Sequence, residues 1–215
     1  MTITEVVATI GGTITAMLAL YGLDAWRREH TGRRQIELAE DTLALFYEAR
    51  DVIADVRNPA SYGYEHEGLT RGEHEADAEY EARKRASIVF TRLAKHSGVL
   101  SRLHAMRYRF MAQIGTSEAQ PFEDLRKIVV EIQTAATMLS RLWAREHFRN
   151  NEAFEAHRAM VEKFEAIFGW GLPEQDPILP KVDKTISAIE ATCRKVINGH
   201  GTLFGLLNAR LKGSL

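Results

Sequence analysis

The sequence contains one cysteine, Cys193, and only five prolines among 215 residues. A single cysteine cannot form an intramolecular disulfide, so small secreted folds that depend on disulfides are excluded. Cys193 lies at helical spacing among isoleucines and valines and has no polarising neighbour, which indicates a buried apolar side chain rather than a nucleophile. Scarce proline, with many Ala, Leu, Glu and Arg residues, favours helix over strand. We therefore predict an all-α fold.

Several motifs of catalysis and cofactor binding are also missing. The sequence has no glycine-rich phosphate loop, no C-x-x-C pair and no H-E-x-x-H motif, and its Ser, His and Asp residues form no recognisable nucleophile setting. The formal net charge is −1, whereas nucleic-acid-binding proteins normally carry a clearly basic face. These absences argue against an enzyme, and we expect neither a cofactor nor a nucleic-acid partner.

An uncharged segment, residues 6–23, lies near the N-terminus. A helix of this length is about 27 Å long, just enough to cross a bilayer. Trp26 and several arginines follow it, whereas no Lys or Arg precedes it, and this asymmetry places the C-terminal flank in the cytoplasm. The alternative is a buried core helix, because threonines and glycines make the segment only moderately hydrophobic. We predict a single-pass membrane protein with its N-terminus outside and a lipid-contacting flank of Arg27, Arg28, Arg33 and Arg34.

Small residues recur every four positions within this segment, at Ala8, Gly12 and Ala16. This spacing lets two spanning helices approach closely, which favours a homo-oligomer. The alternative interpretation is that small residues are simply frequent in spanning helices.

The rest of the chain shows the one-sided apolar spacing of amphipathic helices. We predict an anchor with its basic flank at residues 1–34 and a cytoplasmic helical bundle at 35–215. The bundle should contain about four long helices and one short helix, in antiparallel or coiled-coil packing. The first helix continues the anchor unless Gly32 interrupts it, and the apolar tail, residues 202–215, docks on the bundle or lies on the membrane. The predicted helices span residues 6–56, 77–114, 121–148, 152–168 and 182–198.

The loop at residues 58–76 contains the tripeptide Glu-His-Glu twice, at residues 65–67 and 73–75. Imidazole and carboxylate groups bind divalent metals, so His66 and His74 are candidate ligands. The spacing matches no known metal site, and the surrounding glycines indicate mobility. We favour a solvated acidic loop without a metal.

Arg141 and His147 offer a candidate catalytic pair. HEPN-type ribonucleases use an Arg followed after four to six residues by a His on one helix, and a second pair, Arg194 and His200, also has this spacing. Pairs of this kind are expected by chance in an arginine-rich chain. Leu142 also stands where that family often has a polar residue, so an RNA-cleaving effector is the alternative function, not the leading one.

Two polar residues, His96 and Arg107, fall on the apolar side of the predicted helix 77–114. A polar group there costs roughly 1 to 3 kcal/mol unless it has a partner. They are expected to fix the register of the packing, or else to form a buried ligand or signal-sensing site. Candidate partners of Arg107 are Glu123, Asp124 and Glu131.

Residues 100–110 interleave arginines with Tyr108 and Phe110. This composition is compatible with phosphate or lipid headgroup contact, and equally with a solvated face.

Two blocks, ELAEDTLALFYEARDVI at 37–53 and KHSGVLSRLHAMRYRFMAQIG at 95–115, follow an N-terminal apolar helix with a WRRE flank. Together they resemble a group of uncharacterised proteobacterial membrane-anchored helical proteins. The resemblance implies a bacterial source and a single-pass topology, and it transfers no functional residue. The leading hypothesis is a membrane-tethered scaffold or protein-interaction module that contacts lipid, self-associates and binds a protein partner. A metal or small-ligand sensor is a further alternative.

Overall fold

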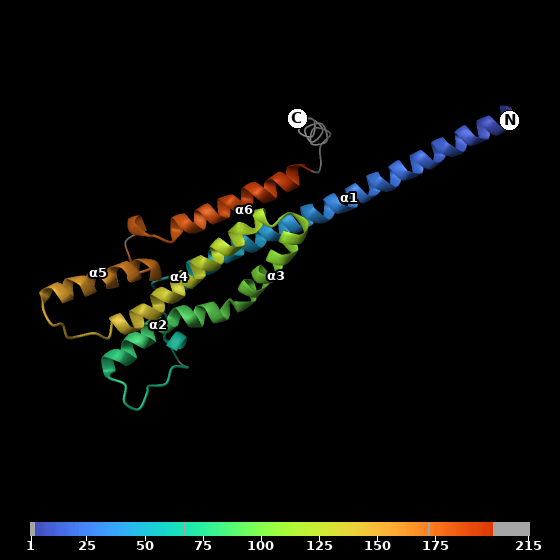
Figure 1. Ribbon diagram of the computed structural model, residues 1–215. Helices are drawn as coiled ribbons and strands as arrows, with labels where there is room; N and C mark the ends of the chain where they lie inside the picture. The colour runs from blue at the N-terminus through green and yellow to red at the C-terminus, as the bar shows by residue number, and fades with distance from the viewer. Residues whose placement is uncertain (1–2, 67, 172, 200–215) are drawn as a thin grey trace. The chain divides into compact units, whose positions relative to one another are not determined.

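The computed structural model describes residues 3–66, 68–171 and 173–199 (Figure 1). Every regular element in these ranges is a helix, so the predicted all-α class is confirmed. Three short 3-10 helices, η1 (Gly63–His66), η2 (Ser117–Ala119) and η3 (Pro173–Gln175), connect longer ones. The α-helices are α1 (Ile3–Val56), α2 (Asp77–Lys95), α3 (Ser97–Gln113), α4 (Gln120–Leu142), α5 (Asn151–Phe168) and α6 (Leu179–Gly199).

The chain divides into two compact units. The larger unit is Thr42–Thr192, and the smaller one is Met1–Asp41 with Cys193–Leu215, of which residues 3–41 and 193–199 are described. The division predicted at residue 34 separated a membrane anchor from a helical bundle, whereas these two units are defined by their compactness, so they do not test that prediction. The apolar tail, residues 202–215, lies outside the described residues.

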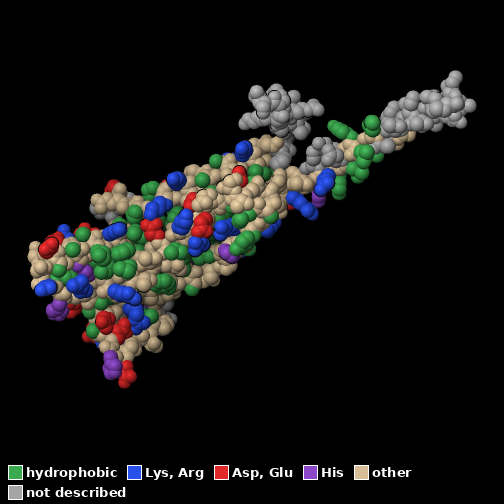
Figure 2. All heavy atoms as spheres, in the orientation of Figure 1, with side chains coloured by type: hydrophobic (Ala, Val, Ile, Leu, Met, Phe, Trp, Pro, Cys, Tyr) green, Lys and Arg blue, Asp and Glu red, His purple; other side chains and the backbone are tan. Residues whose placement is uncertain are grey.

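In the smaller unit, α1 passes through Gly32 without interruption, as predicted for a continuous first helix. Six large apolar side chains of α1 are each 63% to 70% exposed: Met17, Leu18, Leu20, Tyr21, Leu23 and Trp26. Their spacing distributes them around the helix rather than along one face. Figure 2 shows hydrophobic side chains along this part of α1, followed by Lys, Arg and His side chains.

Across the described residues, the structure contains no helix with both the length and the apolar character that a membrane crossing requires. The predicted span falls in part on side chains outside the description, those of residues 6–10, 13, 14 and 16. The prediction of a transmembrane helix therefore gains no support from the structure.

The helix predicted at 77–114 is interrupted at His96, which corrects the sequence-based prediction. His96 has φ −97° and ψ 14° and separates α2 from α3. Its ring Nε2 lies 2.8 Å from the Asp55 carboxylate of α1, and Gly98 follows with its low helix propensity. Beyond the break the buried residues of α3 are Val99, Leu103 and Phe110.

Helix α4 also differs from the prediction, because it ends at Leu142 rather than near Phe148. Trp143 follows directly, and its indole Nε1 donates to the Glu165 carboxylate of α5 at 2.8 Å. Its ring stacks on Trp170 with a centroid distance of 4.9 Å. The chain is therefore held against α5 from Trp143 onward instead of continuing as a helix.

The larger unit is a helical bundle in which α4 packs against both α2 and α5. Phe122 of α4 lies in its core, with its ring 4.8 Å from Phe46 of α1 and 5.4 Å from Phe110 of α3. On the surface, Lys181 of α6 pairs with Glu131 of α4 at 2.6 Å. Aromatic packing thus joins three helices at one point, and an ion pair adds the fourth.

A buried arginine, Arg92 of α2, closes the corner between α1 and α2. Its side chain pairs with Glu65 at 2.6 Å, and it donates to the carbonyl oxygens of Asp55 at 3.0 Å, Asn58 at 2.7 Å and Ala60. Its Nη2 also donates to the second carboxylate oxygen of Glu65 at 3.1 Å, so each of the five N–H groups of the guanidinium has an acceptor. Because these carbonyls lie in the last turn of α1 or just after it, Arg92 satisfies acceptors that a helix end would otherwise leave open.

Arg57 likewise satisfies carbonyl acceptors at the end of α5. It donates to the Ile167 and Ala166 carbonyls and pairs with both carboxylate oxygens of Asp176, all at 2.9 Å. Gly169 ends α5 with φ 117°, and a Cβ there would stand 2.2 Å from the Arg57 carbonyl oxygen. Only glycine fits this close approach.

Candidate functional site

A pocket of about 240 Å³ lies between α3 and α4 in the larger unit. Helical spacing explains how its wall forms, because residues three, four and seven positions apart lie on one side of a helix. The α3 wall therefore contains Leu100, Leu103, His104 and Arg107. The α4 wall contains Phe122, Leu125, Arg126, Val129, Val130 and Gln133.

Arg107 supplies the principal polar group of the pocket. Its Nη1 lies 3.3 Å from the Glu123 carboxylate of α4, which identifies one of the three partners proposed from the sequence. Its Nε is buried and has no hydrogen-bond partner among the described residues. A buried donor without an acceptor costs about 1 to 3 kcal/mol, so this atom marks an interaction that the chain itself does not complete.

Arg126 shares the same carboxylate. Its Nη2 lies 2.6 Å from Glu123, and this hydrogen bond is the main cause that lowers the pKa of Glu123. Two guanidinium groups thus face one carboxylate. The local charge is positive by one before His104 is counted.

His104 lines the pocket, and its ring packs edge-on against Tyr108 with a centroid distance of 5.2 Å. His104 and Tyr108 are both exposed. The residues that line the pocket include no carboxylate, thiol or hydroxyl group. Two guanidinium groups beside an apolar wall suit the binding of an anionic, partly apolar group.

Arg141 and His147, the candidate nuclease pair, do not share a helix. Arg141 is exposed in the last turn of α4, whereas His147 is exposed in the non-helical segment beyond it. The HEPN-type motif needs both side chains on one helix. The early end of α4 at Trp143 removes that arrangement here, and His200 of the second pair lies outside the described residues.

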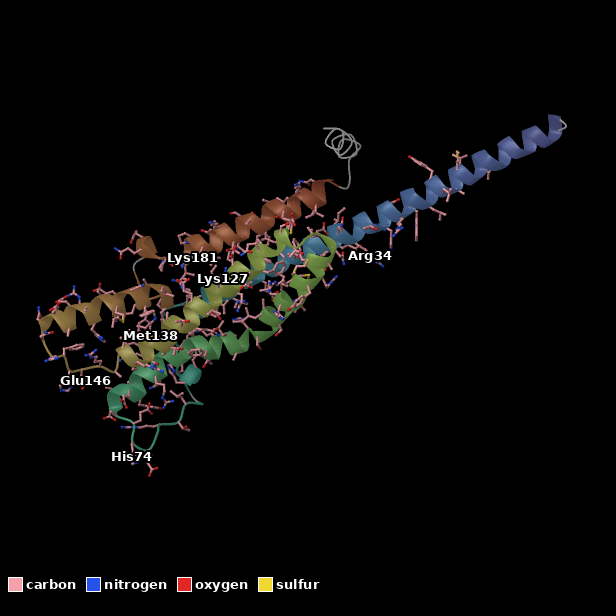
Figure 3. All side chains as sticks on the ribbon, viewed as in Figure 1. Arg34, His74, Lys127, Met138, Glu146 and Lys181 are labelled. Carbon is pink, nitrogen blue, oxygen red and sulfur yellow. The ribbon has the colours of Figure 1, made fainter. Side chains whose placement is uncertain are left out.

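The two candidate metal ligands, His66 and His74, lie in separate parts of the loop before α2. His66 ends η1, and Figure 3 shows His74 at the far end of the loop. No group of three metal-ligating side chains occurs among the described residues.

Two acids of this loop, Glu65 and Glu75, are less solvated than predicted, whereas Glu73 is exposed. Glu65 is buried against Arg92, which lowers its pKa by hydrogen bonding. Glu75 pairs with Arg83 at 2.6 Å, and this bond, helped by the Gly72 N–H, lowers the pKa of Glu75 to about 2. Ion pairs with Arg83 and Arg92 of α2 therefore hold parts of a loop whose composition indicated mobility.

His96, the other polar residue of the predicted apolar face, pairs with Asp55. The hydrogen bond from His96 is the largest cause that lowers the pKa of Asp55. His96 is thus a structural partner of α1 and does not line the pocket.

The predicted membrane residues can be placed only in part. The side chains of Ala8, Ala16 and Arg28 lie outside the description. Gly12 is exposed, and a Cβ added there would meet no atom within 4 Å. The remaining predicted headgroup contacts are exposed on α1: Arg27, Arg33 and Arg34, the last labelled in Figure 3.

Cys193 is buried, as predicted, and burial raises the pKa of its thiol to about 12. A thiol that stays protonated at neutral pH is a poor nucleophile.

Sequence reasoning singled out Arg107 but missed Arg126 and His104 as its neighbours. The available signal was weak: Arg126 stands next to the apolar positions 122, 125 and 129 of the inner face of α4. Nothing in the sequence indicates that the side chains between α3 and α4 leave a space unfilled.

The fold and this pocket define a class, an all-α helical bundle with a basic-apolar pocket between two of its helices. No protein-family description matches the chain, and no match was found among curated proteins or among solved structures.

Proposed function

We propose that the chain is a non-catalytic helical scaffold and interaction module that residues 6–23 tether to the bacterial inner membrane. In this proposal the N-terminus lies outside and the larger unit lies in the cytoplasm. The observation that carries it is the apolar surface of α1, where six large side chains between residues 17 and 26 are mostly exposed. A helix that is apolar all round needs cover from lipid or from other helices.

The hydrophobic effect sets the free energy gained when these side chains are covered. Burying one large apolar side chain is worth about 1.5 to 3 kcal/mol, so leaving six in water is costly. The uncharged segment 6–23 lengthens the same apolar stretch toward the N-terminus. The exposed Arg27, Arg33 and Arg34 follow it and favour a cytoplasmic C-terminal side.

A second copy of the chain is the proposed partner within the membrane. Small residues at positions 8, 12 and 16 repeat at the spacing that allows close helix approach. Open space around the Cα of Gly12 is compatible with such an approach. Protein partners would bind the larger unit, which presents exposed apolar side chains such as Phe90, Phe154 and Met160.

Membrane fractionation tests the tether. The full-length chain, expressed in bacteria with a C-terminal cytoplasmic reporter, should sediment with membranes after an alkaline wash and keep the reporter active. The double variant Leu18→Glu with Leu20→Glu should release it. The matched control is Leu179→Glu, which changes an exposed leucine of the larger unit and should stay membrane-bound. A wild-type chain that is soluble without detergent, or a reporter that is exported, would overturn the proposal.

Crosslinking in native membranes tests the self-association. The wild-type chain should give a crosslinked homo-oligomer, and Gly12→Leu should reduce it. Gly22→Leu is the control, because Gly22 lies on α1 in equally open space but outside the four-residue repeat. Equal crosslinking of both variants would remove the small-residue face from the proposal.

A further inference from the structure

We propose that the pocket between α3 and α4 binds a small apolar carboxylate, with its anionic group on Arg107 and Arg126 and its apolar body against the leucine and valine wall. This site goes beyond the tether and the scaffold role. Three features carry it: an unfilled donor, a local excess of positive charge and a pocket of limited size.

The unfilled donor is the Nε of Arg107. It is buried without a hydrogen-bond partner among the described residues, although the same side chain reaches Glu123. A guanidinium group presents its N–H groups as a planar fork that matches the two oxygens of a carboxylate. In the present arrangement a ligand atom cannot touch the buried Nε, so a ligand carboxylate would give it an acceptor only after the Arg107 side chain turns toward the pocket.

The charges around the pocket favour an anion. Arg107 and Arg126 share the single carboxylate of Glu123, so one positive charge is left over. The neighbouring acid, Asp124, is already engaged by Gln120 at 2.9 Å and Lys127 at 3.7 Å. A metal cation would be repelled here, whereas a monoanion would balance the two arginines.

The volume and the wall restrict the body of the ligand. A cavity of about 150 Å³ lined by aliphatic and aromatic side chains accepts benzene. The pocket, at about 240 Å³, has room for a body somewhat larger than one ring, such as an aryl or medium-chain acyl group. The wall of Leu100, Leu103, Leu125 and Val129 is apolar, which disfavours inorganic phosphate and sugars. Two acyl chains of a membrane lipid would not fit.

Titration calorimetry on the full-length chain in neutral phosphatidylcholine nanodiscs tests the proposal. The probe is octanoate, and octanamide and butyrate are the matched uncharged and short ligands. Octanoate should bind, and octanamide should bind about tenfold more weakly or less because it cannot form charge-assisted hydrogen bonds. Butyrate should also bind more weakly, because it buries fewer methylene groups.

Variants locate the binding. Arg107→Gln should weaken octanoate binding about tenfold or more, whereas Arg109→Gln, which removes an equal charge from an exposed position of α3 outside the pocket, should leave it unchanged. Val129→Phe should also reduce binding, because it fills the apolar half of the pocket. This second variant retains the test if Arg107→Gln does not fold.

Three results would overturn the proposal. These are no octanoate binding at millimolar concentration, equal affinity for octanamide, and octanoate binding that Val129→Phe leaves intact. Arg107-dependent binding of phosphatidylglycerol vesicles without any octanoate binding would instead assign the arginines to a lipid surface and would also overturn it.

Discussion

The corner between α1 and α2 and the pocket between α3 and α4 each contain an arginine, and the two arginines differ in how completely they are hydrogen-bonded. Arg92 is 5% exposed, and all its N–H groups reach Glu65 or backbone carbonyls. The Arg107 side chain is 31% exposed, shares Glu123 with Arg126 and leaves its Nε without an acceptor. A saturated arginine stabilises the fold, whereas an unsaturated one beside a cavity offers a binding site.

The largest expected effect concerns Arg92. Arg92→Met should lower the free energy of unfolding by about 3 to 5 kcal/mol, because Glu65 and the carbonyls after α1 lose their buried donor. Urea denaturation measures this. The double variant with Glu65→Leu should regain part of the loss. Arg102→Met is the control, since Arg102 pairs with Glu48 on the surface and should cost at most about 1 kcal/mol. Equal losses of unfolding free energy in the Arg92 and Arg102 variants would show that the buried ion pair is no more stabilising than the surface one.

The next largest expected effect on stability concerns the end of α5, where Gly169 lies against the Arg57 carbonyl. Gly169→Ala should lower the unfolding free energy by about 2 kcal/mol or more, because alanine at φ 117° is strained and its Cβ would strike the Arg57 carbonyl. Gly98→Ala should instead be neutral or stabilising by about 0.5 kcal/mol, because Gly98 is helical and has open space around it. Urea denaturation of both variants measures the two changes in unfolding free energy. Similar changes would contradict the close approach of Gly169 to the Arg57 carbonyl.

Acid should weaken these corners. Burial alone would raise the pKa of Asp176, but hydrogen bonds from Arg57 and from the Ile178 and Leu179 N–H groups outweigh it and leave that pKa lowered. The pKa values of Glu65 and Glu75 are also lowered, that of Glu75 from 4.5 to about 2. Lowered carboxyl pKa values stabilise the fold above their ordinary range, and this contribution is lost as the pH falls through the folded values.

The melting temperature should therefore fall by several degrees between pH 5 and about pH 2 to 3. The decline should be shallower in the variant that carries both Arg92→Met and Glu65→Leu, because the pair at the α1–α2 corner no longer contributes. Calorimetry across this range provides the test. If the melting temperature of this variant falls as steeply with pH as that of the wild type, Glu65 does not contribute to the acid sensitivity.

The smallest expected effect is at Arg107. Arg107→Gln should change the unfolding free energy by less than about 1 kcal/mol, because Glu123 keeps Arg126 and one unsatisfied donor disappears. Chemical denaturation in the absence of ligand measures this value. A loss as large as that of Arg92→Met would make Arg107 a structural residue and would contradict the contrast.

Local patterns in the sequence were enough to predict the class of the fold, the continuity of α1, the bounds of α5 and the burial of Cys193. They did not reveal the break at His96, because this histidine also fits the helical period of the apolar face. What breaks the helix is a contact with Asp55, which lies 41 residues away along the chain. The early end of α4 depends in the same way on Trp143 and the distant Glu165.

The candidate site was predictable only in part. The sequence indicated that Arg107 would need a partner and named Glu123 among three candidates. It gave no sign that Glu65 would be buried, because its partner Arg92 lies 27 residues further along the chain. Nor can helical periodicity show an unfilled volume, which depends on how the side chains of α3 and α4 meet.

The contrast between the two arginines can be measured directly by the nitrogen-15 NMR signals of their Nε–H groups in the labelled full-length chain. The Arg107 signal should shift as octanoate is added, because its Nε–H gains an acceptor, while the Arg92 signal should stay unchanged. An Arg107 signal that stays constant at saturating octanoate, or an Arg92 signal that responds as strongly, would contradict the account.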